Sequence, residues 1–129
     1  MKTILQLLNM RLLSKIISAV FTLLFIWAAF VQYNDPDALL WYCIYGLAAI
    51  ASFLFLMEKL FLVVPVVLSF AYFIGAYIFW PSRFEGVSID GGNISNIEHA
   101  RESLGLLISA FVMMFYAWRI RIPGKTLNV

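Results

Sequence analysis

Residues 38–57 read ALLWYCIYGLAAIASFLFLM, an apolar run without a charged side chain. A run of about 20 apolar residues matches the hydrocarbon thickness of a bilayer. Lipid offers no water to the backbone N–H and C=O groups, so such a run must satisfy them internally as a helix. We therefore predict that residues 38–57 form a transmembrane helix.

Three more apolar runs accompany this stretch, at residues 12–33, 60–80 and 97–118. The chain of 129 residues is 64% hydrophobic and only 12% charged, whereas soluble domains carry about 25% charged residues. We predict a single transmembrane domain over residues 1–129, an integral, multi-pass protein with the lipid bilayer as its partner. The plasma membrane, or the inner membrane in a bacterium, is the expected location. No nucleic-acid partner is expected, because no room remains for a soluble module.

The first run has an alternative interpretation as a signal peptide, since Lys2, Arg11 and Lys15 precede it. Its apolar part is longer than the roughly 7 to 15 residues of a signal peptide, and it lacks a convincing small-residue cleavage site. These features favour a retained helix.

The connections between the runs predict the topology. Residues 34–37 and 58–59 are short links that force antiparallel hairpins, and residues 81–96 form the long loop. Seven of the nine basic residues fall on one side: Lys2, Arg11, Lys15, Lys59, Arg119, Arg121 and Lys125. The positive-inside rule makes that side cytoplasmic. The prediction is an all-α, integral-membrane four-helix bundle with both termini cytoplasmic and the loop at 81–96 outside.

The acidic residues separate in the opposite direction. Of the seven, only Glu58 falls on the inner side; the others are Asp35, Asp37, Glu85, Asp90, Glu98 and Glu102. Acids contribute little to topology, so this separation points to a function on the outer side.

The first acidic corner is residues 32–37, QYNDPD. Helix capping accounts for its acids, with Asp35 as the N-cap and Asp37 at the positive end of the helix dipole. Capping does not explain why Asp37, Trp41 and Tyr45 recur at i, i+4 and i+8 along one face. Such a stripe suits a lipid headgroup or a small polar ligand.

The second acidic corner lies at residues 95–105, SNIEHARESLG. Ser95 and Glu98 match a capping box, which predicts a helix start near residue 96 or 97. Glu98, Arg101 and Glu102 then share a face, and charges at membrane depth commonly mark a functional pathway. A local Glu98–Arg101 ion pair is the structural alternative.

If the helices meet at the outer surface, the two corners surround one pocket. Its candidate ligand-binding residues are Gln32, Asn34, Asp35, Asp37, Trp41, Tyr45, Glu98, Arg101 and Glu102. Carboxylates and an imidazole could hold a divalent cation, with Asp37, Glu98, His99 and Glu102 as weak candidates, although Arg101 argues against a bare metal. No catalytic residue and no cofactor is assigned, because the chain has no nucleophile motif, phosphate-binding glycine loop or HExxH.

The two polar motifs carry a family resemblance. The run 32–37 with Trp41 and Tyr45, together with Glu98-x-x-Arg101-Glu102-x-x-Gly105-Leu106, resembles the transmembrane protein 220 family of small four-helix membrane proteins. The resemblance covers most of the chain. It implies the fold and the choice of polar residues, and it implies no particular reaction.

Three functions follow as hypotheses. The first is a non-enzymatic membrane protein that binds a polar ligand, lipid headgroup or cation in a pocket of the outer leaflet. The second is an accessory or assembly subunit of a larger membrane complex, whose acidic patch is completed by a partner or by a second copy of the chain. The third is a membrane-embedded enzyme that uses a carboxylate acid–base pair.

Overall fold

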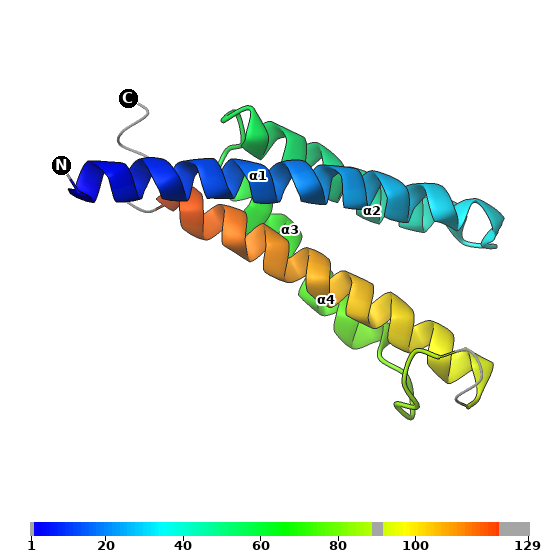
Figure 1. Cartoon of the computed structure of the whole chain (residues 1–129). Coiled ribbons are helices and arrows are strands. Elements are labelled where there is room, and N and C mark those ends of the chain that lie inside the picture. The colour runs from blue at the N-terminus through cyan, green and yellow to red at the C-terminus, as the bar shows by residue number, and fades with distance from the viewer. Residues whose placement is uncertain (1, 89–91, 122–129) are drawn as a thin grey trace. The chain divides into compact units, whose positions relative to one another are not determined.

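The computed structural model describes residues 2–88 and 92–121, so Asp90 and Lys125 lie outside the described residues. The described part is all-α, as predicted, and contains no strand. Its helices are α1 (Lys2–Phe30), α2 (Ala38–Leu56), α3 (Val63–Phe79) and α4 (Ile94–Arg121), with a short 3-10 helix, η1 (Val31–Asn34), after α1 (Figure 1).

The described chain divides into two compact units. The first unit takes its residues from 1–65 and 116–129, and the second from 66–115. The first unit therefore contains α1, α2 and the last turns of α4, while the second contains most of α3 and the larger part of α4. Each unit is described by itself, and the single transmembrane domain stays a prediction.

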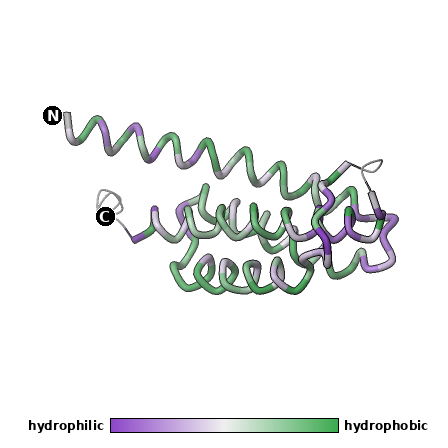
Figure 2. Tube along the Cα trace, turned by 90° about the horizontal axis from the view of Figure 1, so that it is seen from below, coloured by the Kyte–Doolittle hydropathy of each residue, from purple (hydrophilic) through white to green (hydrophobic). Residues whose placement is uncertain are grey.

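Three described helices are long and apolar enough to cross a membrane. These candidate spans are Thr3–Asn34, Ala38–Leu56 and Ile94–Arg121, and Val63–Phe79 is a shorter apolar helix. Their hydrophobic character is visible along most of α2 and α3 (Figure 2). Large apolar side chains are exposed, Phe61 at 78% and Leu39 at 76%. An apolar surface of this kind is suited to lipid, and the protein is an integral membrane protein.

The helix α3 is shorter than the apolar run that predicts it. Its 17 residues extend roughly 26 Å at 1.5 Å per residue, against about 30 Å for the hydrocarbon core. The run begins at residue 60, but residues 57–62 are used to end α2 and turn the chain. Pro65 falls in the first turn of α3, where its missing N–H costs no helical hydrogen bond.

In the first unit, α1 and α2 form an antiparallel hairpin joined by η1 and residues 35–37 (Figure 1). Small side chains are buried along both helices, among them Ser14 and Ser18 on α1 and Ala48 and Ser52 on α2. Small residues allow helix backbones to approach closely in a membrane. The Ala48-x-x-x-Ser52 spacing therefore serves packing.

In the second unit, α3 and α4 are held by two hydrogen bonds from serine. Ser69 Oγ donates to the carbonyl of Ala110 at 3.2 Å, and Ser103 Oγ donates to the carbonyl of Ala76 at 2.6 Å. A Cβ atom placed on Gly75 would lie 3.3 Å from Leu106 Cδ1. Because Ser69 precedes Ala76 on α3 while Ala110 follows Ser103 on α4, the two helices run antiparallel.

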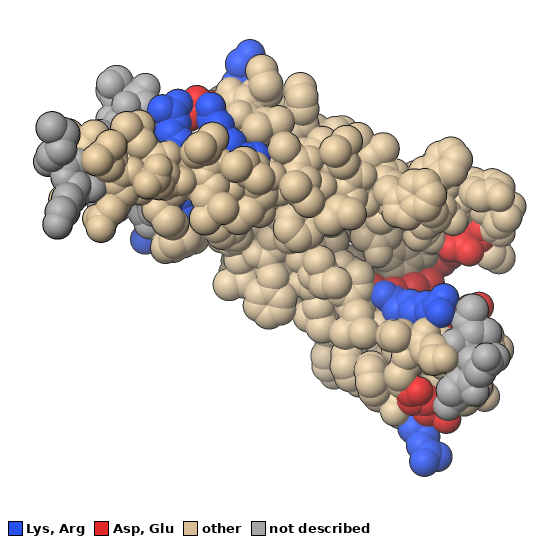
Figure 3. Space-filling model, in the orientation of Figure 1, with Lys and Arg blue, Asp and Glu red and all other residues tan. Residues whose placement is uncertain are grey.

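On the face drawn in Figure 3, uncharged side chains separate the basic side chains near the start of α1 from the acidic side chains at the α1–α2 turn. In the first unit, Asp35 and Asp37 precede α2, and Glu58 follows it. The 19 residues of α2 separate them by roughly 28 Å. The first unit thus has an acidic end at the α1–α2 turn and an opposite end that carries Glu58 among basic residues. Which end faces the cytoplasm stays a prediction.

Candidate functional site

The first acidic corner is built by η1 and the turn that follows it. Gln32 Nε2 donates to the carbonyl of Ala28 at 3.1 Å, and the backbone N–H of Asp35 donates to the carbonyl of Gln32 at 2.9 Å. Gln32 is half-buried, and Asn34, Asp35 and Asp37 are exposed. The amide of Gln32 is thus used to end the helix, while the two carboxylates point into the surroundings.

The N-cap of α2 lies two residues later than the sequence predicts. Asp37, not Asp35, is the N-cap of α2, and its side chain makes no capping hydrogen bond. The first turn of α2 instead bonds to backbone, with the N–H of Leu40 donating to the carbonyl of Asp37 at 3.1 Å. The prediction of Asp35 as the cap is wrong, because residues 35–37 form a turn before the helix begins.

Asp37 instead joins the aromatic stripe that its spacing predicts. The indole Nε1 of Trp41 donates to Asp37 Oδ2 at 3.0 Å. Trp41 is 1% exposed, and its ring stacks on that of Tyr45 with centroids 5.9 Å apart. The ring of Tyr45 in turn stacks on that of Phe25 of α1, with centroids 6.4 Å apart. A buried indole therefore fixes the position of an exposed carboxylate.

The second acidic corner begins at a different cap from the expected one. The helix α4 starts at Ile94, and Asn93 Oδ1 accepts the backbone N–H of Ser95 at 2.9 Å. Asn93 is thus the N-cap, a role that asparagine fills as well as serine does. The capping box of Ser95 and Glu98 is not used, and Glu98 is exposed.

A carboxylate that the sequence did not single out closes this corner. Glu85 Oε1 accepts Asn96 Nδ2 at 2.7 Å and the backbone N–H of Asn93 at 3.3 Å. The hydrogen bond from Asn96, with the N–H of Asn93 and the charge of Arg83, outweighs partial burial and lowers the pKa of Glu85. Glu85 therefore ties the outer loop to the start of α4. Its acidic side chain in a glycine-containing loop was the only signal in the sequence.

The charged side chains at the start of α4 differ in their partners and exposure. Arg101 Nε donates to the carbonyl of Val87 at 2.8 Å, so this guanidinium is bonded to the loop backbone and not to Glu98. Glu102 is half-buried. His99 Nδ1 lies 2.9 Å from the carbonyl of Ser95, and its ring centroid is 6.5 Å from that of Phe79. His99 is thus turned toward helix backbone and an aromatic ring.

The predicted site residues fall into two groups. The first unit holds Gln32, Asn34, Asp35, Asp37, Trp41 and Tyr45, and the second holds Glu98, His99, Arg101 and Glu102. The first acidic corner thus lies in the first unit and the second acidic corner in the second unit. Among the described residues, no three His, Cys, Asp or Glu side chains come together as a metal site requires.

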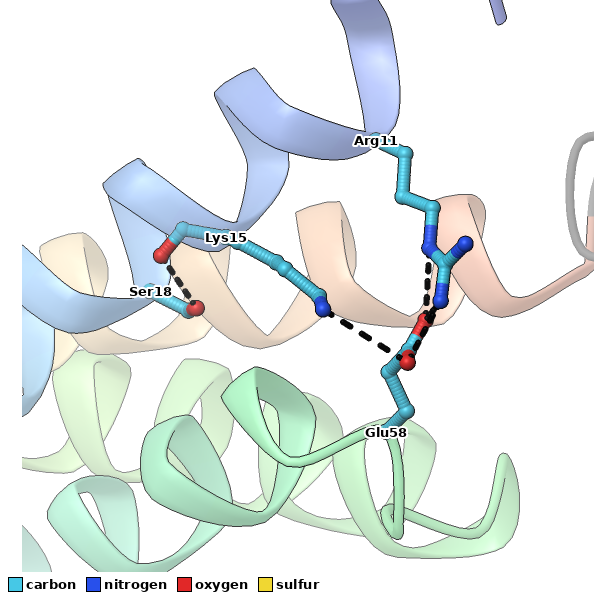
Figure 4. Close-up of polar contacts among 4 residues, drawn as sticks. All are labelled: Arg11, Lys15, Ser18 and Glu58. Atoms are coloured by element: carbon cyan, nitrogen blue, oxygen red, sulfur yellow. Dashed lines mark hydrogen bonds and ion pairs between the residues drawn. The ribbon is translucent and has the colours of Figure 1, made fainter. Parts of the chain in front are cut away.

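The opposite end of the first unit contains a charged cluster that sequence reasoning missed. Arg11 donates to Glu58 from Nε at 2.7 Å and from Nη2 at 2.6 Å, and Lys15 Nζ lies 3.6 Å from Glu58 Oε2 (Figure 4). Partial burial would raise the pKa of the Glu58 carboxyl, but the hydrogen bonds and charge of Arg11, with the charge of Lys15, hold it below 4.5. The sequence contains a signal for this cluster, because Glu58 is the one acidic residue on the predicted basic side.

Glu58 also has an unusual backbone. It follows α2 with φ at +60°, its N–H bonds to the carbonyl of Phe55, and the N–H of Lys59 bonds to the carbonyl of Leu54. This pair of bonds is the Schellman ending of a helix, in which the left-handed position is usually glycine.

Taken together, these features define a multi-pass α-helical membrane protein with apolar helix surfaces and polar ends. A family model described as "Transmembrane family 220, helix" matches residues 24–118. The chain therefore belongs to the transmembrane protein 220 family, as its two polar motifs predict. No curated protein and no solved structure matches it. The matched region includes both acidic corners, whereas Arg11, Lys15 and Arg119 lie outside it.

Proposed function

We propose that this chain is a non-enzymatic membrane protein that binds a polar ligand at its acidic end, with a lipid headgroup as the foremost class. The observation that carries the proposal is the placement of Asp37. Its carboxylate does not cap α2, and a buried indole holds it through Oδ2. No hydrogen bond to Oδ1 comes from the described residues, so this oxygen is available to a donor.

The chemistry of the corner favours a ligand that donates hydrogen bonds. Asp35 and Asp37 are both exposed, and an ionised carboxylate only accepts. An ammonium or hydroxyl group of a lipid headgroup meets this requirement, and the turn before a membrane-spanning helix places the carboxylates at headgroup depth. The rings of Trp41 and Tyr45 are buried below Asp37 and support its position without offering a surface to the ligand. Phosphatidylethanolamine is the simplest lipid of this class.

The second corner supports the proposal in its own right. Glu98 and Arg101 are exposed at the start of α4. The Glu98 carboxylate offers a ligand an acceptor, and Arg101, whose Nε donates to Val87, carries further N–H donors. A bare divalent cation receives less support, because the carboxylates described in either unit do not group as a metal site does.

The test is native mass spectrometry of the protein extracted from its own membrane in mild detergent. We expect a co-purifying polar lipid or small molecule that is lost in Asp37→Asn. The loss of a hydrogen bond to a charged group lowers the affinity roughly tenfold or more. Asp35→Asn is the comparison variant, because no indole holds this second exposed carboxylate, and it should lose less ligand than Asp37→Asn.

Equal ligand content in wild type, Asp37→Asn and Asp35→Asn would refute the proposal. A stoichiometric protein in place of the small ligand would favour the accessory-subunit hypothesis instead. Turnover of a co-purified molecule that disappears in Glu102→Gln would favour the enzyme.

A further inference from the structure

A second site is indicated at the other end of the first unit. We call this region the basic end and define it by Arg11, Lys15, Glu58, Lys59 and Arg119. The start of α1 and the last turns of α4 both lie toward this end (Figures 1 and 2). It is distinct from the acidic corner, which lies at the opposite end of α2.

Arg119 is the unusual member of the basic end. Its side chain is 8% exposed, and its Nε atom is buried without a hydrogen-bond partner among the described residues. The guanidinium carbon lies 5.6 Å from the centroid of the Trp118 ring, a contact that gives the Nε–H group no acceptor. A buried N–H donor without an acceptor is costly, so an acceptor from outside the chain would relieve a real penalty.

The last turns of α4 direct Arg119 toward the end of α2. Tyr116, one turn earlier on the same face, donates its hydroxyl to Ser52 Oγ at 2.7 Å and stacks on Phe55 with centroids 4.5 Å apart. Both helices end toward the same side (Figure 1). Arg119 therefore lies at the level at which α2 gives way to Glu58.

Glu58, the acidic residue at this level, already has hydrogen-bond partners. Both carboxylate oxygens of Glu58 accept from Arg11, and Lys15 approaches one of them. Glu58 therefore neutralises only one of the two cations of α1, and its oxygens already accept from them. Lys59 is exposed and adds further positive charge. The described basic end thus lacks negative charge at the position of Arg119.

We propose that the basic end binds a phosphate group, with Arg119 as the central donor and with Arg11 and Lys15 adding charge from α1. A guanidinium matches phosphate because it presents parallel N–H donors to two oxygens of the anion. The group can come from an anionic phospholipid headgroup or from free phosphate. The basic side is predicted to be cytoplasmic, and anionic lipids are concentrated in that leaflet.

The test uses the full-length protein and three variants reconstituted in nanodiscs of phosphatidylcholine with a small fraction of phosphatidylglycerol. Arg119→Gln removes the central donor, Arg119→Lys keeps the charge but loses the Nε donor and the planar fork, and Arg121→Gln is the matched control with an exposed arginine two residues away. Native mass spectrometry after release counts phosphatidylglycerol retained per protein. A second arm measures thermal unfolding in neutral detergent with and without inorganic phosphate.

We expect retained phosphatidylglycerol to fall about tenfold in Arg119→Gln and several-fold in Arg119→Lys, because charged hydrogen bonds are lost. Arg121→Gln should change it by less than about twofold, as a screened surface charge would. If inorganic phosphate alone raises the unfolding temperature of wild type, and Arg119→Lys abolishes this shift, the site is supported and its ligand is free phosphate. Equal retention by wild type and Arg119→Lys, with no phosphate-dependent shift, would overturn the proposal even if Arg119→Gln fails to fold.

Discussion

Glu58 combines a left-handed backbone with a side chain held by two cations. A non-glycine residue in this conformation costs about 1 to 3 kcal/mol and persists where its surroundings compensate. Here the two hydrogen bonds from Arg11 hold the carboxylate, and the Schellman bonds hold the backbone. The sequence could not predict this turn, because the usual signal for a left-handed helix end is a glycine and none occurs between Gly46 and Gly75.

The pairing of Glu58 makes stability depend on pH. The pKa of its carboxyl is lowered on folding, so its stabilising contribution is fully present above the ordinary value of 4.5 and disappears as the pH falls through the folded pKa. The side chain is 34% exposed, so solvent screening limits the contribution to about 1 kcal/mol or less.

We predict that Glu58→Gln lowers the free energy of unfolding, measured by SDS titration, more at pH 7 than at pH 3. Arg121→Gln should show no such pH-dependent difference from wild type. A deficit in Glu58→Gln that is equally large at both pH values would show that the ion pair is not its source.

Asp37 shows what a residue pattern can and cannot predict. The i, i+4, i+8 spacing with Trp41 and Tyr45 correctly predicts a stripe, because helix geometry alone brings these side chains together. The same spacing cannot reveal whether the carboxylate bonds to the helix N-terminus or to the indole. That choice depends on where the turn ends, and it decides between a capping role and an exposed acceptor.

Among the elements, the ends of the helices differ most from expectation. Residues 60–62 are apolar and suit a helix, but the left-handed turn at Glu58 delays α3 until Val63. Residues 94–96 are included in α4 because Asn93 provides a cap earlier than Ser95 would. Apolar runs mark the lipid-facing length of a helix, whereas the ends are decided by side-chain and backbone bonds that hydropathy does not contain.

The loop before α4 offers a test of its own. Gly92 lies against Glu85, and a Cβ atom at residue 92 would be 2.5 Å from Glu85 Oε2 and 3.1 Å from its Cβ atom. Gly92→Ala should therefore displace Glu85 from the N–H of Asn93 and from Asn96. We predict that the Asn93 amide exchanges its hydrogen about tenfold faster, since a hydrogen bond to a charged acceptor is lost.

Gly46→Ala is the matched control for this loop. A Cβ atom there meets nothing within 4 Å, and alanine favours a helix, so exchange at Asn93 should stay at the wild-type rate. An unchanged rate in Gly92→Ala would show that Glu85 does not restrain the start of α4.

At the scale of the whole molecule, composition and hydropathy predicted the all-α membrane fold, and the two polar motifs predicted the family. Composition and hydropathy are averages over many residues, so a wrong interpretation of one residue does not change the predicted fold class. The sequence also predicts that acids and bases lie at different ends of the helices. Within the first unit, Asp35 and Asp37 lie a helix length from Glu58. The buried Arg119 could not be found in the same way, because a basic residue near the end of a span is usually interpreted as one that snorkels to water.

Both proposed sites depend on the predicted orientation, in which the acidic end faces outward and the basic end faces the cytoplasm. Its most direct test is labelling of intact cells with a membrane-impermeant maleimide, in a Cys43→Ser background that carries a single new cysteine. Ser88→Cys in the loop before α4 and Arg121→Cys at the end of α4 are both at exposed positions. We predict that Ser88→Cys is labelled from outside and that Arg121→Cys is labelled only after the membrane is opened; the reverse pattern would contradict the assignment of both sites.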